Sequence, residues 1–250
     1  MQILKLNPLE NFIVISDVHL RDPNDNLTNL FISTLNSLSN TEAIFLLGDI
    51  FDFVAVKSNF FFKLWKNVFQ ALQNLKEKGV QVYFIEGNHD FGFEHFKSPF
   101  LNNCFNAYGD FIIEFQHPQL GLIHLRHGDD IICKPSYLKF RSFVKNKYFQ
   151  HMISWLVCGR LMHFIFSRYA KISRKKDAYR TLSETFLNSC LNLTINKYSN
   201  INVLIIGHIH ILRDFMIDNR VRFLVGPDWM SQPSYLIYNS NMGFERKFIH

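Results

Sequence analysis

Short apolar runs alternate with amphipathic stretches in the first third of the chain. Residues 25–39 carry apolar side chains at helical spacing, and residues 60–78 have the pattern of an amphipathic helix that ends at Gly79. Three apolar runs of strand length flank these helices, at residues 12–16, 43–47 and 80–85. Strands separated by helices of this length predict a βαβαβ unit with parallel strands.

The pattern changes in the second half. Phe111–Phe115 and Leu122–Arg126, with Gly121 between them, predict a β-hairpin, whereas residues 135–198 have a mostly helical pattern. Asp218-Asn219 predicts a tight turn. Four further short strands are predicted, at residues 203–206, 215–217, 222–225 and 235–238. A chain of 250 residues fits one large domain, so we expect a single domain over 1–250 with a helical cap inserted at about 135–198.

Composition narrows the class of protein. Hydrophobic residues make up 48% of the chain and charged residues 19%, which is typical of a globular protein. The four cysteines, at 104, 133, 158 and 190, show no CxxC spacing, which argues against a disulfide framework or a structural zinc site and favours a reducing compartment. We expect no signal peptide and no membrane-spanning helix, since no apolar run reaches the roughly 18 residues that a span requires.

Five polar clusters each follow a predicted strand directly. Ligands in open α/β sheets bind at the carboxyl ends of strands, so these clusters are expected to meet there. One such cluster alone would be weak evidence, because Asp and His commonly cap helices or bind backbone groups. Five in this order predict a shared site. They are Asp17-Val-His19, Gly48-Asp49-Ile-Phe-Asp52, Gly87-Asn88-His89-Asp90, His127-Gly128-Asp129 and Gly207-His208-Ile-His210.

The side-chain types in these clusters indicate metal chemistry. Carboxylate, imidazole and amide oxygen without thiolate suit Mn²⁺, Fe²⁺ or Zn²⁺ and suit Ca²⁺ poorly. Two such metal ions can clamp a phosphoryl group, provided that one carboxylate bridges them. The sequence therefore predicts a hydrolase that cleaves phosphorus–oxygen bonds.

The motif series D-x-H, G-D-x-x-D, G-N-H-[DE], a histidine after a strand, and G-H-x-H resembles the calcineurin-like metallophosphoesterases. This resemblance implies a four-layer α/β sandwich, in which two mixed β-sheets are flanked by helices, with the helical cap as an insertion. It also implies two metal sites that share one bridging carboxylate. One metal ion would be held by Asp17, His19, Asp49 and His210. The other would be held by Asp49, Asn88, His127 and His208.

The same resemblance gives roles to residues beside the ligands. His89 would contact the scissile phosphate as proton donor or charge stabiliser, and Asp52 would orient it, as a carboxylate commonly orients a catalytic imidazole. Asp90 and Asp129 are expected to support ligands or cap helices rather than to bind metal. Mn²⁺ is the expected ion.

Charge is unevenly distributed along the chain. Residues 134–180 hold 12 of the 27 Lys and Arg and one acid, Asp177, so this segment has a formal charge of +11 against −5 for the remainder. Aromatic residues lie among these basic residues. One interpretation is a pair of amphipathic helices with a solvated basic face. The other is a cap whose apolar side holds acyl chains or enters a bilayer surface while its basic residues face anionic head groups.

The metal motifs together with this cap resemble the UDP-2,3-diacylglucosamine diphosphatases of lipid A biosynthesis, notably in the stretch HGDDIICKPSYLKFR. One branch of that family has Arg after the Asn of the third motif, whereas this chain has His89, as a second branch does. The resemblance implies hydrolysis of the pyrophosphate of UDP-2,3-diacylglucosamine to UMP and 2,3-diacylglucosamine 1-phosphate. The residues expected to bind substrate are Asn88, Ser173, Arg174, Lys175, Lys176 and His208.

A substrate with acyl chains implies a protein attached peripherally to the cytoplasmic face of a Gram-negative inner membrane. An anionic membrane surface is then an expected partner, and neither nucleic acid nor an obligate protein partner is expected. Two alternatives remain open on the sequence. One is a metallophosphoesterase for another substrate, such as a nucleotide diester or a phosphoprotein. The other is a non-catalytic module that binds nucleic acid or membrane through the basic segment.

Overall fold

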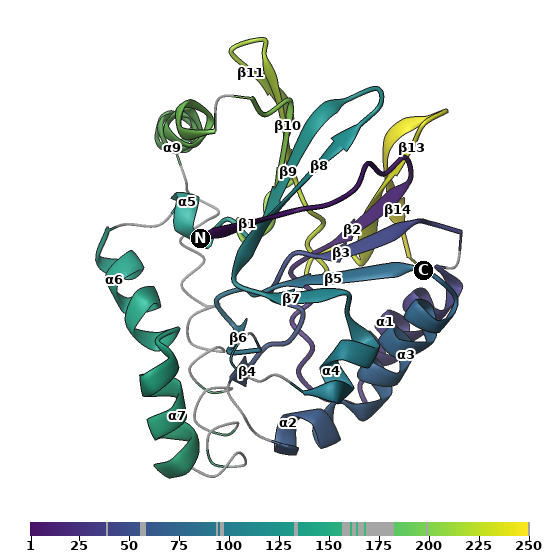
Figure 1. Cartoon of the computed structure of the whole chain (residues 1–250), viewed down its shortest axis with the longest axis vertical. Coiled ribbons are helices and arrows are strands. Elements are labelled where there is room, and N and C mark those ends of the chain that lie inside the picture. Colours follow the sequence, from purple (N-terminus) through teal and green to yellow (C-terminus); the bar gives the residue numbers. More distant parts are fainter. Residues whose placement is uncertain are drawn as a thin grey trace.

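Two six-stranded mixed sheets form the centre of the molecule, as Figure 1 shows for the computed structural model. The structure describes residues 1–38, 40–55, 59–93, 95, 98–132, 135–156, 161, 164, 168, 183–198 and 200–249. The first sheet has the order β1 (Gln2–Lys5), β8 (Phe111–His117), β9 (Gly121–Arg126), β10 (Val203–Ile206), β12 (Val221–Val225) and β11 (Asp214–Ile217).

The second sheet contains the predicted βαβαβ unit. Its order is β14 (Gly243–Phe248), β13 (Ser234–Asn239), β2 (Phe12–Ile15), β3 (Ala43–Leu46), β5 (Gln81–Ile85) and β7 (Ala107–Gly109). Strands β2, β3 and β5 are parallel neighbours, as predicted. A separate two-stranded sheet joins β4 (Val54–Ala55) and β6 (Asp90–Phe91).

Helices cover the outer faces of both sheets (Figure 1). The second sheet is covered by α1 (Asn26–Ser37), α3 (Lys66–Glu77) and α4 (Pro99–Cys104), with α2 (Asn59–Leu64) beside them. The first sheet is covered by α5 (Asp129–Ile132) and α9 (Glu184–Lys197). At one side of the molecule lie α6 (Pro135–Val144) and α7 (Lys147–Leu156). Among the described residues, no helix is long and apolar enough to cross a membrane.

The alternation of side chains along β2 explains this layering. Ile13 and Ile15 point into the core under α1 and α3, whereas Phe12 and Val14 point into the core between the two sheets. Phe12 meets Phe115 of the opposite sheet edge to face, with ring centroids 5.2 Å apart. A third core packs α9 against the first sheet. The predicted four-layer α/β sandwich is thereby confirmed.

Local signals set several element ends where they were expected. The Asp25 side chain caps α1 by accepting a hydrogen bond of 2.7 Å from the Thr28 amide, and Gly79, with φ of +89°, follows the end of α3. The single helix predicted over 60–78 was wrong, because the structure has two helices, α2 and α3. Trp65 separates them. Its indole ring is buried, and the centroid of this ring lies 5.2 Å from the centroid of the Phe51 ring.

Further differences concern weakly patterned strands. Strands β1, β7 and β14 were not predicted, since β1 and β14 are half-exposed edge strands and β7 has only three residues. The hairpin of β8 and β9 is antiparallel as expected, but Gly121 opens β9 instead of lying in the turn. The described residues between β9 and β10 include the helices α5, α6, α7 and α9. A separate cap remains a prediction, because residues 157–160 and 169–182 lie outside the described part.

Candidate metal centre

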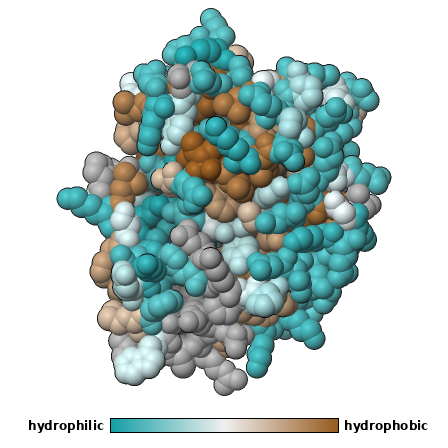
Figure 2. All heavy atoms as spheres, viewed as in Figure 1, coloured by the Kyte–Doolittle hydropathy of each residue, from teal (hydrophilic) through white to brown (hydrophobic). Residues whose placement is uncertain are grey.

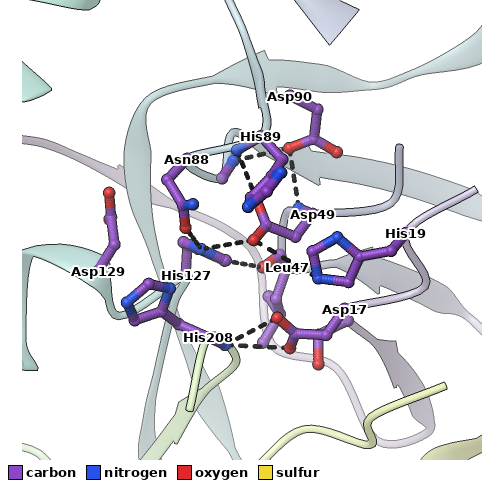
Figure 3. Close-up of polar contacts among 12 residues, drawn as sticks. Asp17, His19, Leu47, Asp49, Asn88, His89, Asp90, His127, Asp129 and His208 are labelled. Carbon is purple, nitrogen blue, oxygen red and sulfur yellow. Dashed lines mark hydrogen bonds and ion pairs between the residues drawn. The ribbon is translucent and has the colours of Figure 1, made fainter. Parts of the chain in front are cut away.

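The five polar clusters follow five strands whose carboxyl ends lie close together. Three follow β2, β3 and β5 of the second sheet, and two follow the parallel strands β9 and β10 of the first sheet. Figure 3 shows the side chains from both sheets converging on the space between the strand ends. The structure therefore brings all five clusters together, although they span almost 200 positions of the chain.

Asp49 lies at the centre of this group. Its Oδ2 atom is 3.8 Å from Nε2 of His19 and 3.7 Å from Nε2 of His127. Its Oδ1 atom accepts a hydrogen bond of 2.9 Å from the amide of His89. One carboxylate thus stands between an imidazole of the first cluster and an imidazole of the fourth, which is the position that a bridging ligand requires.

The other expected ligands divide around Asp49. Nε2 of His210 lies 3.8 Å from Oδ1 of Asp17, and Oδ1 of Asn88 lies 3.1 Å from Nε2 of His127. Three triplets of candidate ligand atoms each lie within 4.8 Å of one another. They are Asp17, His19 and His210; Asp49, His127 and His208; and His19, Asp49 and His89.

These residues fit divalent metal ions. Donor atoms 3.1 to 3.8 Å apart can each reach one ion at a ligand distance of about 2.0–2.2 Å. The far ring nitrogens are held in place, because Nδ1 of His127 lies 2.7 Å from the Leu47 carbonyl oxygen and Nδ1 of His210 lies 3.1 Å from Asp228. Such partners orient an imidazole so that Nε2 faces the metal. Bound ions would polarise phosphoryl oxygens and stabilise the charge that develops on them.

The backbone of the ligand loops is held in an uncommon conformation. Among the described non-glycine residues with positive φ, five are expected ligands: Asp17, His19, Asp49, His208 and His210, with φ between 51° and 72°. Left-handed backbone in such residues costs free energy and is concentrated at functional sites. The remaining two, Asp218 and Asn219, form the predicted tight turn between β11 and β12.

Two motif glycines provide space for the ligands. A Cβ atom on Gly207 would lie 2.7 Å from Oδ2 of Asp17, and one on Gly87 would overlap Oδ1 of Asp49. Glycine is therefore required here for close approach to a carboxylate rather than for a special φ.

Burial and neighbouring charges shift the pKa values of the clustered side chains in different directions. Burial alone would raise the pKa of Asp49, but four surrounding imidazoles, first that of His127, hold it well below its usual range. Burial and the nearby His127 lower the pKa of His208 to about 3. Burial would also lower the pKa of His210, but the carboxylates of Asp17 and Asp228 raise it to about 9. The site thus holds negative charge on Asp49 at neutral pH, as cation binding requires.

The expected catalytic pair lies beside the metal ligands in a different geometry. Nδ1 of His89 lies 2.9 Å from the backbone carbonyl oxygen of Asp52, whereas Oδ1 of the Asp52 carboxylate lies 3.7 Å from Nδ1 of His19. The contact that orients His89 is therefore made by the Asp52 backbone, which corrects the expected carboxylate contact. His89 also lies close enough to His19 and Asp49 to be a candidate ligand, a role not expected from the sequence.

Asp90 and Asp129 organise the surroundings of the ligands. The Asp90 carboxylate accepts hydrogen bonds from the amides of Gly87, Asp49, Ile50 and Phe51, at 2.9, 2.8, 2.6 and 3.2 Å. It therefore ties the loop after β5 to the loop after β3. Asp129 is the first residue of α5, and its Oδ2 accepts a hydrogen bond of 2.6 Å from Nε of Arg141.

Two residues that contact a ligand or a neighbour of the ligands, from outside the metal site itself, were not identified from the sequence. Asp228 bonds His210 and follows β12 in the segment Gly226-Pro-Asp228, which is the same strand-then-polar pattern as in the five clusters. That pattern could have revealed it. Arg141 belongs to the basic segment, and nothing in its spacing indicated a carboxylate partner. The expected substrate residues Ser173, Arg174, Lys175 and Lys176 lie outside the described residues.

Residues 10–212 match the family profile described as calcineurin-like phosphoesterase. The chain belongs to this family. The predicted family and the phosphoesterase class are thereby confirmed, and the motif series that the family shares is the one that builds the Asp49-centred cluster.

Several curated relatives of this calcineurin-like phosphoesterase have the same name, UDP-2,3-diacylglucosamine hydrolase. The protein of Wigglesworthia glossinidia brevipalpis is 27% identical over 238 residues, covering 92% of this chain and 91% of the relative. The protein of Aliivibrio fischeri (strain MJ11) is 29% identical over 248 residues, covering 92% and 95%. The protein of Histophilus somni (strain 2336) is 26% identical over 245 residues, covering 92% and 97%.

Proposed function

We propose that this phosphoesterase hydrolyses the pyrophosphate of UDP-2,3-diacylglucosamine to UMP and 2,3-diacylglucosamine 1-phosphate, using two Mn²⁺ ions. The observation that carries the proposal is the Asp49 carboxylate between His19 and His127, because it offers one bridging ligand to two ion sites. The similarity to relatives named for this substrate extends over 92% of the chain, and so includes the insertion as well as the metal motifs.

The protein groups of the site have separable roles in this reaction. The residues that would hold the ions are Asp17, His19, Asp49, Asn88, His127, His208 and His210, and Asn88 and His208 would also bind the substrate. Because a carbonyl oxygen only accepts, His89 donates its Nδ1–H to the Asp52 carbonyl. Its Nε2 is then the nitrogen that would exchange a proton with the substrate or stabilise charge on the phosphate.

The helices α6 and α7 suit the lipid part of this substrate. Phe140, Phe143 and Trp155 are exposed on them, and Lys139 and Lys147 are exposed among these aromatic residues. Figure 2 shows pale and brown side chains beside teal ones along the edge of the molecule where α6 and α7 lie. We propose that this surface contacts acyl chains and the anionic head groups of a bilayer, and that the protein works peripherally at the cytoplasmic face of the inner membrane.

The decisive assay measures UMP release from UDP-2,3-diacylglucosamine beside turnover of bis(p-nitrophenyl) phosphate and a phosphopeptide. We expect UMP release that a chelator abolishes and that Mn²⁺ restores better than Mg²⁺, Zn²⁺ or Ca²⁺. The Asp49→Asn variant should lose this activity, while Asp214→Asn, on an exposed hairpin, should keep it. Turnover of the diester or the phosphopeptide without UMP release would replace this proposal with one of the other substrate classes.

A further inference from the structure

A partly buried ion-pair network joins α6 to the neighbourhood of the metal ligands. Nε of Arg141 donates to Oδ2 of Asp129 at 2.6 Å, while its two terminal nitrogens donate to the two oxygens of Asp110 at 3.0 and 2.6 Å. Nζ of Lys145 lies 3.2 Å from Oδ1 of Asp110. These four residues, called the Arg141 network below, join three segments: the end of β7, the turn after His127 and the helix α6.

The guanidinium suits this task better than an ammonium group would. Its planar fork presents donors in fixed directions, so one side chain binds two carboxylates that come from different segments. Burial would lower the pKa of Arg141, but Asp129 and Asp110 raise it above its usual value. Without Arg141, Asp129 and Asp110 would lose their hydrogen bonds to the guanidinium, and Lys145 would remain as the cation that acts on both carboxylates.

The network also fixes which way α6 faces. Val144 and Lys145 follow Arg141 by three and four positions, at the end of α6 and directly after it, and therefore lie on the same side as Arg141. That side is anchored to the body of the protein, because Arg141 and Lys145 bind the two carboxylates and Val144 packs against the main core. Phe140 and Phe143 lie off this side, 54% and 56% exposed.

The chain that returns from the insertion is tied to the same turn. Arg126, directly before His127, forms an ion pair with Asp130, and its guanidinium lies 5.8 Å from the ring of Tyr198, directly after α9. Asp129 and Asp130 therefore connect the ligand loop of His127 to both flanks of the insertion, to α6 through Arg141 and to α9 through Arg126.

We propose that Arg141 is a positioning residue that determines specificity: it holds α6 against the edge that carries His127, so that exposed aromatic residues of α6 contact the apolar part of a substrate bound at the metals. This inference rests on the proposed function for the idea that the substrate has an apolar part. Beyond that function, the inference names Arg141 as the residue that holds α6 beside the metal site.

The test compares two synthetic diesters, p-nitrophenyl methyl phosphate and p-nitrophenyl dodecyl phosphate, so that it does not depend on the sugar nucleotide. The wild-type protein should have a lower KM for the dodecyl ester. The Arg141→Gln variant should raise the KM for this ester by roughly tenfold, with kcat and the kinetics of the methyl ester nearly unchanged, because binding common to ground and transition states is lost. The KM of Arg141→Lys for the dodecyl ester should lie between those of the wild type and of Arg141→Gln.

Two further variants and one independent measurement accompany this test. Asp110→Asn removes the other partner of the fork and should act in the same direction as Arg141→Gln. Arg222→Gln breaks an exposed Arg–Asp pair on the β11–β12 hairpin, and both KM values should stay at the wild-type level. Hydrogen–deuterium exchange should become faster in α6 of the Arg141 and Asp110 variants, while β2, β3 and β5 keep their protection.

Three results would overturn the inference. The first is a wild-type protein that does not discriminate between the two esters. The second is an equal loss of activity on both esters in Arg141→Gln, which would mean that the network supports the metal site in general. The third is unchanged exchange in α6. Absence of UMP release from the diacylated sugar nucleotide would instead refute the proposed function, and these ester and exchange results would still decide the role of Arg141.

Discussion

The carboxylate of Asp228 lies 3.1 Å from Nδ1 of His210, while the other ring nitrogen of His210 faces Asp17. The imidazole is thus oriented, through the ring nitrogen that faces away from Asp17, by a carboxylate that does not belong to the five motifs. Asp228 is itself positioned, because its Oδ1 also accepts a hydrogen bond of 3.0 Å from the amide of Met230. The last ligand of the chain therefore depends on the segment after β12 for its orientation.

This arrangement predicts that Asp228→Asn weakens metal binding. An amide in place of the carboxylate makes the imidazole less basic and holds its tautomer less firmly, so affinity at the site of His210 should fall by about 10–100-fold. Titration calorimetry with Mn²⁺ on chelator-treated protein measures this directly. Asp214→Asn serves as the control, since Asp214 pairs with Arg222 on an exposed hairpin. Equal Mn²⁺ affinity in the two variants would contradict the role of Asp228.

The close approach of Gly87 to Asp49 gives a second prediction. Alanine at position 87 would push a methyl group into Oδ1 and the amide nitrogen of Asp49, so the bridging carboxylate must move. We expect at least ~10²-fold lower activity in Gly87→Ala, since misplacement by about 1 Å has that effect in active sites. Gly79→Ala is the control: it has open space but φ of +89°, so it should lose stability and keep its activity per folded molecule.

The role of His89 can be separated from that of the ligands. If His89 exchanges protons or stabilises charge, His89→Gln should lower kcat by about 10²–10⁴-fold while the protein still binds its full complement of metal. Metal content of the purified variant, measured by mass spectrometry beside kcat, distinguishes this from loss of a ligand. His95→Gln is a suitable control, because His95 contacts the Lys145 carbonyl and matches no motif. A variant that holds one ion fewer than the wild type would make His89 a ligand.

The sequence predicted the metal site better than the contacts around it. Asp17, Asp49 and His208 could be placed together because each follows an apolar strand, and strand ends of an α/β sheet share an edge. Such a pattern identifies residues but not the atoms that they use. Asp52 was expected to orient His89 with its carboxylate, yet the observed contact is its backbone carbonyl oxygen. Which of the two groups approaches an imidazole depends on the turn, and the residue type does not encode that.

In the fold, too, some elements could be predicted from the sequence and others could not. Strands with both faces buried, such as β2 and β3, have continuous apolar runs and were predicted almost to the residue. Edge strands such as β14 alternate weakly and owe their conformation to hydrogen bonds with a neighbour, here β13, that lies close only after folding. Arg141 was missed for a related reason, since its partners Asp110 and Asp129 are 31 and 12 positions away.

The Asp110 carboxylate should make stability depend on pH in the metal-free protein. Burial alone would raise the pKa of Asp110, but Lys145 and Arg141 hold it below its usual range. A depressed folded-state pKa contributes stability above the unfolded value of about 3.9, and this contribution is lost as the pH falls towards the folded value. Urea unfolding should therefore show Asp110→Asn less stable than the wild type by about 1–3 kcal/mol at neutral pH.

The difference between these two proteins should shrink as the pH falls from about 5 to 3, because the wild-type carboxylate then loses its advantage over the amide. The matched control is again Asp214→Asn, whose exposed pair should contribute less than about 1 kcal/mol at neutral pH. A difference that stays constant or grows on acidification would show that Asp110 is not stabilised as a carboxylate by Arg141 and Lys145.

The exposed indole of α7 offers a direct test of membrane attachment. Of the three tryptophans, Trp65 and Trp229 are each 1% exposed, whereas Trp155 is 86% exposed, so quenching by acrylamide reports almost entirely on Trp155. Phosphatidylglycerol vesicles should shield it from acrylamide and shift its emission to the blue. Phosphatidylcholine vesicles should do so less, and added salt should weaken the effect, because basic residues such as Lys147 then lose their attraction to the surface. The Trp155→Phe variant should lose the fluorescence response while still sedimenting with the vesicles. Unchanged quenching of the wild type by acrylamide in phosphatidylglycerol would contradict attachment through α7.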